Sequence, residues 1–249
     1  MDEEMIIGRN PVMEALQSGR AVNKVLVSDQ VKVQTEKDML HATKKANTIM
    51  QKVPKQRMDQ LSKGKHQGVI AYVAAYEYVS TETILQRAEA EGVAPFLLIL
   101  DEIEDPHNLG AILRTADATG VHGVVIPKRR AVGLTETVAK ASAGAIEHVP
   151  VARVTNIADT IDQLKSNHIW VVGTDEQGSD DYRTLDGDTA LAIVIGNEGK
   201  GMTRLVKNKC DWLVHLPMQG SIPSLNASVA GSLLMYEVFR KRSPLGTKR

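Results

Sequence analysis

Cysteine is almost absent from this sequence of 249 residues, which contains Cys210 alone. No disulfide bond can form within the chain, and we expect a reducing compartment, the cytoplasm. Cys210 is interpreted as a buried structural thiol rather than as a nucleophile. The 7 histidines show none of the spacings typical of metal ligands, so we predict no metal site.

Aromatic residues are also scarce, at 4% of the chain, and no apolar run is long enough to cross a membrane. These two absences argue against a broad platform for stacking bases and against a membrane partner. Net charge is lacking as well, because 30 basic side chains balance 30 acidic ones. The balance is uneven along the chain, since residues 1–75 carry 12 Lys and Arg against 8 Asp and Glu. A local surplus of this size is compatible with contacts to phosphate groups.

Segments typical of strands and of helices alternate along the whole chain, which predicts an α/β fold. Residues 1–75 are expected to form a small α/β domain of three layers. Residues 76–95 are rich in charge and predict a helical linker. Residues 96–249 alternate strand and helix again, and predict a second domain built on a parallel sheet.

Three junctions of strand, loop and helix stand out in the second domain. The buried strand 96–100 leads through a polar turn, residues 104–108, to a helix that carries Arg114 in its first two turns. The strand 191–195 leads into the glycine-rich loop 196–201. The strand 213–216 precedes a loop and a helix, for which Ser224 is the expected N-cap. Open α/β sheets bind ligands at the carboxyl ends of their strands, so we expect a polar ligand at these junctions.

The glycine-rich loop 196–201 fits neither of the common phosphate-binding patterns, G-x-G-x-x-G and G-x-x-x-x-G-K-[ST]. This argues against a dinucleotide or a nucleoside triphosphate as the ligand. A cationic triplet, Lys128, Arg129 and Arg130, follows another expected strand at the same edge of the sheet. We interpret this triplet as a contact to RNA phosphates.

The three junctions carry a resemblance to a known family. Their motifs read N-x-G-x-x-x-R-T-A (108–116), I-G-N-E-G-x-G (195–201) and L-P-M-x-G-x-x-x-S-L-N-A-S (216–228). In this order they resemble the motifs of the SpoU branch of the SPOUT RNA methyltransferases. The resemblance implies a parallel-sheet catalytic domain with a trefoil knot, a homodimer, and S-adenosylmethionine as methyl donor. Residues 5–75 resemble the substrate-binding domain of the RlmB-type ribosomal RNA guanosine-2'-O-methyltransferases.

The resemblance also assigns roles to residues of this chain. Arg114 is the expected catalytic side chain, and in the family it is either a general base for the 2'-hydroxyl or an electrostatic clamp. We prefer a clamp that binds a phosphate and stabilises the developing 2'-oxyanion, because a guanidinium is not readily deprotonated; the proton would leave through water or a transiently neutral arginine. Glu198 is expected to hold Arg114 or to complement the sulfonium charge, and the other expected catalytic residues are Asn108, Ser224 and Asn226. The cofactor pocket is expected to comprise Gly173, Thr174, Ile195, Gly196, Asn197, Gly199, Leu216, Met218 and Leu225. Gly196 is expected to let the backbone approach the ligand closely.

The function predicted from the sequence is methylation of a ribose 2'-hydroxyl in RNA, with a guanosine of 23S ribosomal RNA as the expected target and no DNA partner. Two alternatives remain. One is a tRNA 2'-O-methyltransferase of the TrmH branch, whose members usually lack the N-terminal domain. The other is a non-catalytic RNA-binding factor for ribosome assembly, against which the intact Asn108, Arg114, Glu198 and Asn226 argue.

Overall fold

The chain forms two compact units in the structure, a computed structural model that describes residues 5–62, 65–74, 76–221 and 224–243. The first unit contains the described residues up to Glu77 together with Gly133–Glu136. The second unit contains the described parts of Tyr78–Val132 and of the chain from Thr137 onward. None of the helices that the structure describes is both long enough and apolar enough to span a bilayer.

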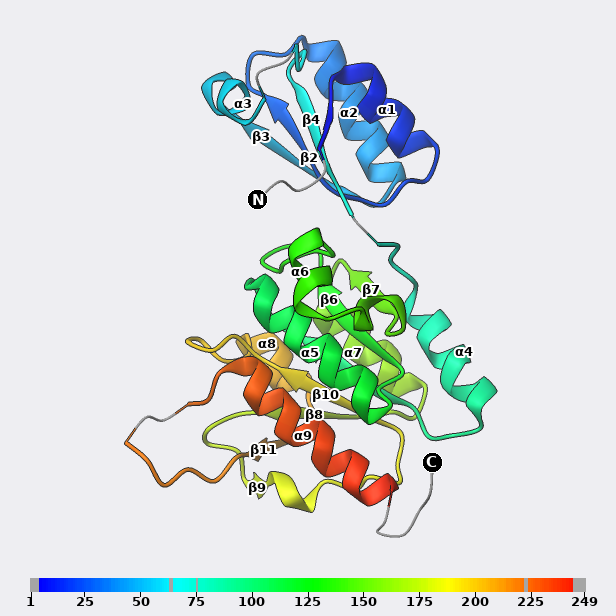
Figure 1. Ribbon diagram of the computed structural model, residues 1–249, viewed down its shortest axis with the longest axis vertical. Helices are drawn as coiled ribbons and strands as arrows, with labels where there is room; N and C mark the ends of the chain where they lie inside the picture. Colours follow the sequence, from blue (N-terminus) through cyan, green and yellow to red (C-terminus); the bar gives the residue numbers. More distant parts are fainter. Residues whose placement is uncertain (1–4, 63–64, 75, 222–223, 244–249) are drawn as a thin grey trace. The chain divides into compact units, whose positions relative to one another are not determined.

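The first unit is a four-stranded sheet with helices on both faces (Figure 1). Its elements are β1 (Met5–Ile7), α1 (Arg9–Gln17), β2 (Val22–Ser28), α2 (Val33–Lys45), β3 (Ile49–Val53), α3 (Lys55–Leu61) and β4 (Val69–Val73). The strand order is β1-β4-β2-β3. Met39 of α2 belongs to the core on one face, and Met58 of α3 to the core on the other. The three layers expected from the sequence are therefore present.

The second unit contains a sheet of seven strands that are all parallel, in the order β7-β6-β5-β10-β8-β11-β9. The strands are β5 (Phe96–Leu100), β6 (Gly123–Pro127), β7 (Val151–Val154), β8 (Trp170–Thr174), β9 (Asp180–Asp181), β10 (Leu191–Ile195) and β11 (Trp212–His215). The two central strands, β5 and β10, are apolar and buried at every position, as expected for parallel strands covered on both faces.

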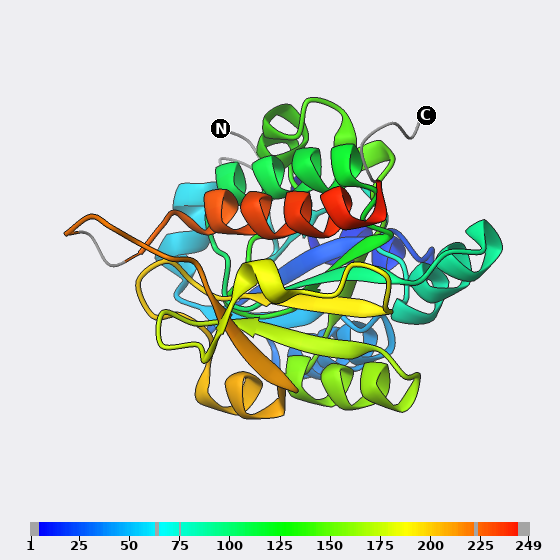
Figure 2. The ribbon, with the colours of Figure 1, turned by 90° about the horizontal axis from the view of Figure 1, so that it is seen from below.

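Helices cover both faces of this sheet (Figure 2). Two of them, α5 (Pro106–Thr119) and α9 (Ala227–Arg242), lie side by side on one face. On the other face lie α7 (Ile157–Ser166) and α8 (Arg204–Lys209). The remaining helices are α4 (Thr81–Glu91), α6 (Glu136–Ala141) and the two 3-10 turns η1 (Ala145–Glu147) and η2 (Tyr182–Thr184). The helix expected in the linker 76–95 is α4, and it belongs to the second unit.

Two features of α9 fix its position over the sheet. A Cβ atom at Gly231 would lie 2.6 Å from Cδ1 of Ile195, so the absence of a side chain allows α9 to approach β10. The helix begins at Ala227, and its N-cap is Asn226, whose side-chain oxygen accepts hydrogen bonds from the backbone N–H groups of Ser228 and Val229. The prediction that Ser224 caps this helix is therefore wrong, because the first helical turn starts three residues later.

The helix that carries Arg114 begins earlier than expected. Asp105 is its N-cap and accepts a hydrogen bond from the backbone N–H of His107, while Pro106 occupies the first helical position. His107 and Asn108 consequently lie inside α5 rather than in the preceding turn. Arg114 stands at the ninth helical position, in the third turn rather than in the first two.

Candidate functional site

The three junctions singled out in the sequence meet at one edge of the sheet. β5, β10 and β11 all run in the same direction, and β10 is hydrogen-bonded to β5 on one side and to β8 on the other. β11 pairs with β8. The loops that follow these strands therefore emerge at the same carboxyl edge, as predicted, and they are joined there by the loop after β8.

Asn108, Glu198 and Asn226, one from each junction, form a hydrogen-bonded cluster. The Asn108 side-chain amide donates to Oε1 of Glu198 at 2.7 Å, and the Asn226 amide donates to Oδ1 of Asn108 at 2.9 Å. The Asn226 amide also donates to Oε1 of Glu198. The same oxygen accepts from the backbone N–H of Ala227, at the start of α9, at 3.2 Å. The Glu198 carboxylate is thus held by three neutral donors, one of them at the N-terminus of α9.

The loop after β10 closes tightly on itself. The backbone N–H and C=O of Asn197 pair with those of Gly201, and the side-chain oxygen of Asn197 accepts from the N–H groups of Gly199 and Lys200. A Cβ atom at Gly196 would lie 2.3 Å from the carbonyl carbon of Gly201 and from the nitrogen of Met202. Gly196 is therefore required by the backbone of its own loop. This reason is separate from the close approach to a ligand that was expected.

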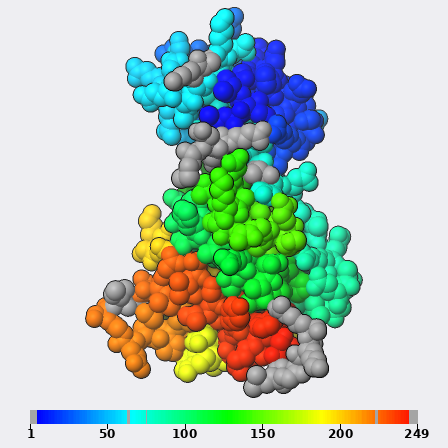
Figure 3. Space-filling model, in the orientation of Figure 1, coloured from blue at the N-terminus to red at the C-terminus, as the bar shows by residue number. Residues whose placement is uncertain are grey.

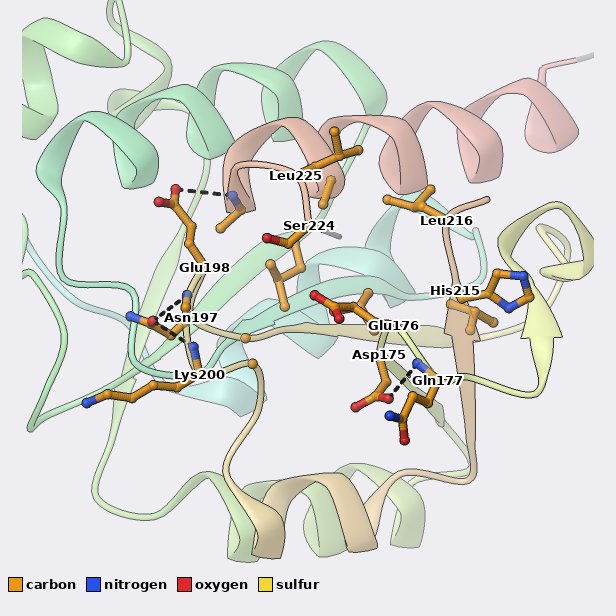
Figure 4. A pocket seen from close by; sticks show the side chains of 18 of the residues that line it. Asp175, Glu176, Gln177, Asn197, Glu198, Lys200, His215, Leu216, Ser224 and Leu225 are labelled. Atoms are coloured by element: carbon orange, nitrogen blue, oxygen red, sulfur yellow. Dashed lines mark hydrogen bonds between the residues drawn. The ribbon is translucent and has the colours of Figure 1, made fainter. Parts of the chain in front are cut away.

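A pocket of about 750 Å³ opens at this edge of the sheet (Figure 4). It is lined by the loops after β8, β10 and β11 and by the first turns of α9. Nine of the residues predicted for the site line it: Thr174, Ile195, Gly196, Asn197, Glu198, Gly199, Leu216, Met218 and Leu225. Ser224 lines it as well, although it does not cap the helix. Leu216, Leu225 and Leu234 supply apolar side chains to the lining, and Asp175, Glu176 and Lys200 are among its polar ones.

Gly173 is not among the residues that line the pocket. A Cβ atom there would lie 2.7 Å from side-chain carbons of Leu213 and Met202 and 2.9 Å from Sγ of Cys210, so this glycine makes room for the core beneath the sheet. Burial, reinforced by the nearby Asp211, raises the pKa of the Cys210 thiol to about 12. The thiol therefore stays protonated near neutral pH, in agreement with the structural role expected for it.

The loop after β8 supplies polar residues that were not predicted from the sequence: Asp175, Glu176 and Gln177. Asp175 forms an ion pair of 2.6 Å with Lys207, and Nδ1 of His215 is hydrogen-bonded to the carbonyl oxygen of Gly178 at 2.9 Å. Glu176 is exposed, and its carboxyl group points into the pocket in Figure 4. The signal that was available for these residues is their position directly after a strand at the same edge of the sheet.

Arg114 lies outside the pocket, on the exposed side of α5. Its side chain has no hydrogen bond and no ion pair among the described residues. Glu198 therefore does not hold Arg114, which was one of the two roles expected for Glu198. The next residue, Thr115, is hydrogen-bonded to the hydroxyl of Ser232 in α9 at 3.1 Å. This bond ties the two helices together beside the exposed Arg114.

The cationic triplet follows β6 directly, as predicted, but its members differ in their surroundings. Lys128 donates to Oγ1 of Thr155 at 3.1 Å, and burial together with the charge of Arg153 lowers its pKa. Arg130 forms an ion pair of 2.6 Å with Glu102. Arg129 is exposed and has no such partner among the residues that the structure describes. Of the three, Arg129 is the side chain most available to an external phosphate.

Comparisons with known proteins agree on one family. Residues 95–236 match the SpoU rRNA Methylase family, and residues 5–79 match the domain described as RNA 2'-O ribose methyltransferase substrate binding. A Bacillus subtilis (strain 168) protein, assigned by name to the TrmH family of tRNA/rRNA methyltransferases, is 56% identical over 243 residues, which cover 98% of each chain.

Two solved structures are informative because they match different shares of the chain. The SpoU methyltransferase AviRb from Streptomyces viridochromogenes, crystallised with AdoMet, is 25% identical with a TM-score of 0.61, over 96% of this chain and 90% of AviRb. The A. aeolicus TrmH/SpoU tRNA modifying enzyme is 26% identical with a TM-score of 0.55, over 65% of this chain and 83% of that enzyme.

Proposed function

We propose, from the premise that this chain belongs to the SpoU rRNA methylase family, that it methylates a ribose 2'-hydroxyl of 23S ribosomal RNA, with a guanosine as the target. The family assignment makes the protein a methyltransferase that uses S-adenosylmethionine and acts on RNA. The preference for ribosomal RNA is supported by the substrate-binding domain at residues 5–79. The tRNA enzyme of A. aeolicus matches only 65% of this chain. Ribosomal RNA as substrate also supports the cytoplasm as the compartment.

The pocket at the carboxyl edge of the sheet is proposed as the cofactor site, and its chemistry is the single observation that carries this assignment. S-adenosylmethionine supplies a methyl group bonded to a positively charged sulfonium sulfur, together with an adenine base. Leu216, Leu225 and Leu234 offer apolar surface for the base. The carboxyl groups of Glu176 and Glu198 offer negative charge to a cation. The volume of about 750 Å³ is sufficient for a ligand of this size.

The roles of the side chains follow from their positions. Glu198, held by Asn108 and Asn226, keeps a fixed negative charge at the pocket and pins the start of α9. Ser224 lines the pocket beside it and is available to orient a ribose. Arg114, being unpaired among the described residues and permanently charged, is suited to bind a phosphate and to stabilise negative charge that develops on the ribose O2'. The proton of the 2'-hydroxyl leaves to water.

The experiment that tests this function combines binding with mapping of modified nucleotides. Isothermal titration of the full chain with S-adenosylmethionine should show saturable binding, which a non-catalytic assembly factor lacking a cofactor site would not show. Ribosomal RNA and tRNA from cells with and without the gene should then be compared by mass spectrometry for 2'-O-methylation. Loss of one ribosomal guanosine modification supports the proposal, and loss of a tRNA modification instead would move the enzyme to the tRNA branch.

We also propose that the protein is a homodimer whose interface includes α9, and that the second unit carries the trefoil knot expected of the family. The position of β10 between β5 and β8, with α9 returning to pack on α5, supports the knot. The exposed side of α9 supports the dimer, since Val229, Leu233 and Tyr236 are 47%, 42% and 52% exposed. Figure 3 shows α9 at the surface, in orange to red, with α5 beside it in green. Exposed apolar side chains repeating along one helix are typical of an interface.

A test of the dimer requires a substitution on the exposed side of α9. Leu234 and Met235 are unsuitable, because both side chains are fully buried within the unit. Leu233→Asp instead places a charge on the exposed side of α9, and we expect it to give a monomer with little activity. Leu205→Asp is the matched control, because Leu205 is 58% exposed on α8. Sedimentation at micromolar concentration measures the outcome, and a dimeric Leu233→Asp protein would remove α9 from the interface.

A further inference from the structure

Two residues beside the pocket adopt a backbone conformation that side chains normally avoid. Glu102 has a φ of 62° and Arg130 a φ of 55°, although neither is a glycine. They lie in the loops after β5 and β6, and Nη1 of Arg130 is 2.6 Å from Oε1 of Glu102. A left-handed backbone at both partners of one ion pair indicates that the side-chain interaction maintains the conformation.

The surroundings of the ion pair allow it to maintain the backbone conformation of Glu102. The Glu102 side chain is only 12% exposed, whereas that of Arg130 is 72% exposed. The two loops are also joined by the backbone, because the N–H of Val132 donates to the carbonyl oxygen of Ile103 at 3.0 Å. A carboxylate that is largely removed from water requires its guanidinium partner, so Arg130 fixes where Glu102 lies.

Glu102 in turn contacts the loop that lines the pocket. Its backbone carbonyl oxygen accepts a hydrogen bond from the side-chain amide of Asn197 at 3.1 Å. The other end of that side chain accepts from Gly199 and Lys200 at 3.0 Å and 3.3 Å. Asn197 therefore transmits the position of the Glu102 backbone to the turn that forms one wall of the pocket. A change in the φ of Glu102 would move the acceptor and release the amide.

We propose that Arg130 and Glu102 are positioning residues for the cofactor loop: the ion pair holds residue 102 in the left-handed conformation in which its carbonyl oxygen fixes Asn197. The inference rests on the proposed function, in which S-adenosylmethionine occupies this pocket. It gives Arg130 a role different from the phosphate contact expected from the sequence, which stays with its neighbour Arg129. What matters at residue 102 is the conformation of the backbone, which the carboxylate secures.

A pair of substitutions at residue 102 separates backbone conformation from charge. Glu102→Ala removes the carboxylate and leaves a side chain that disfavours a positive φ, so the cofactor loop should lose its anchor. Glu102→Gly removes the same carboxylate, but glycine adopts a φ of 62° readily. We therefore expect the dissociation constant for S-adenosylmethionine to rise about fivefold or more in Glu102→Ala and to stay within about twofold of wild type in Glu102→Gly. Equal weakening in both variants would overturn the proposal.

Arg130 is tested in the same way, by titration calorimetry on the full chain. Arg130→Gln should weaken cofactor binding about as much as Glu102→Ala, and should have no further effect when combined with Glu102→Gly. Arg129→Gln makes the same change of charge at the neighbouring position and should leave cofactor binding unchanged. For Arg130→Gln and Glu102→Ala, kcat measured at saturating cofactor should be within about twofold of the wild-type value. The ion pair positions the loop and does not contact the reacting atoms.

The results distinguish this inference from the function on which it rests. A wild-type chain that does not bind S-adenosylmethionine refutes the proposed function. If wild type binds and Arg130→Gln binds equally well, the inference alone is refuted. Weakened RNA binding with unchanged cofactor binding in Arg130→Gln would assign the residue to the RNA phosphate instead. Melting temperatures and circular dichroism identify unfolded variants. Arg130→Lys retains the charge, and its affinity for S-adenosylmethionine should lie between those of wild type and Arg130→Gln.

Discussion

Arg114→Ala is expected to lower the rate of methyl transfer by roughly 100- to 1000-fold while leaving the affinity for S-adenosylmethionine within a few-fold of wild type. The rate and the affinity should respond differently because of where Arg114 lies. Arg114 is exposed on α5 and does not line the pocket, so its loss leaves the walls of that pocket unchanged. The substitution removes the positive charge that would face a phosphate or the developing 2'-oxyanion. Single-turnover transfer to RNA and cofactor titration measure the two quantities separately.

Arg114→Lys distinguishes two ways in which this arginine could act. Lysine retains the charge but lacks the planar group that binds a phosphate through two N–H donors, and it deprotonates far more readily. A clamp should therefore work poorly with lysine at every pH, whereas a general base should recover activity as the pH rises. Asp117→Ala, one turn further along the exposed side of α5, is the control. A collapse of cofactor binding in Arg114→Ala, equal to the loss of rate, would contradict the assignment.

Gly196→Ala is expected to weaken cofactor binding by about tenfold or more and to lower the melting temperature. The added Cβ would lie 2.3 Å from backbone atoms of Gly201 and Met202, and backbone cannot move aside as a flexible side chain can. The turn around Asn197 must then open, and with it one wall of the pocket. Calorimetric titration together with thermal unfolding detects both effects.

Gly199→Ala is the matched control for this prediction. A Cβ atom at Gly199 would meet only the side-chain oxygen of Asn197, at 3.8 Å, which is an ordinary contact. Cofactor affinity should therefore stay within about threefold of wild type. If Gly199→Ala weakens binding as strongly as Gly196→Ala while the fold stays intact, then glycine in this loop serves the approach of the ligand rather than the geometry of the turn.

The sequence was sufficient to predict where the site lies. Continuous apolar runs at 96–100 and 191–195, alternating with helical segments, are typical of buried parallel strands, and the segments that follow such strands emerge at one edge of the sheet. Because the motifs fall directly after such strands, most of the residues predicted for the cofactor pocket do line it. The exception among them is Gly173. It lies near the end of β8, but it faces the core under the sheet rather than the pocket.

Contacts between loops could not be predicted in the same way. Local chemistry makes Ser224 and Asn226 comparable helix caps, and only the path of the chain before Ala227 decides for Asn226. Glycine is required at position 196 because a turn brings the backbone of Gly201 against it, and this contact is not visible in the sequence. The side of α9 that faces outward could not be predicted either. Apolar residues occur all round this helix, so the sequence does not indicate which side packs on α5 and β10. The pairing of Glu102 with Arg130 joins two separate loops and has no signature in either.

The cluster of Asn108, Glu198 and Asn226 has a consequence for the synthesis of the protein. The hydrogen bonds of Glu198 to Asn108 and Asn226 span 90 and 28 residues, and that between Asn108 and Asn226 spans 118. Contacts of such long range form late in folding, because the intervening loops must close first. A growing polypeptide can therefore assemble most of its central sheet before Asn226 has left the ribosome, and still lack the anchor of Glu198. We therefore expect the enzyme to become competent to methylate RNA only after α9 has been translated and has docked.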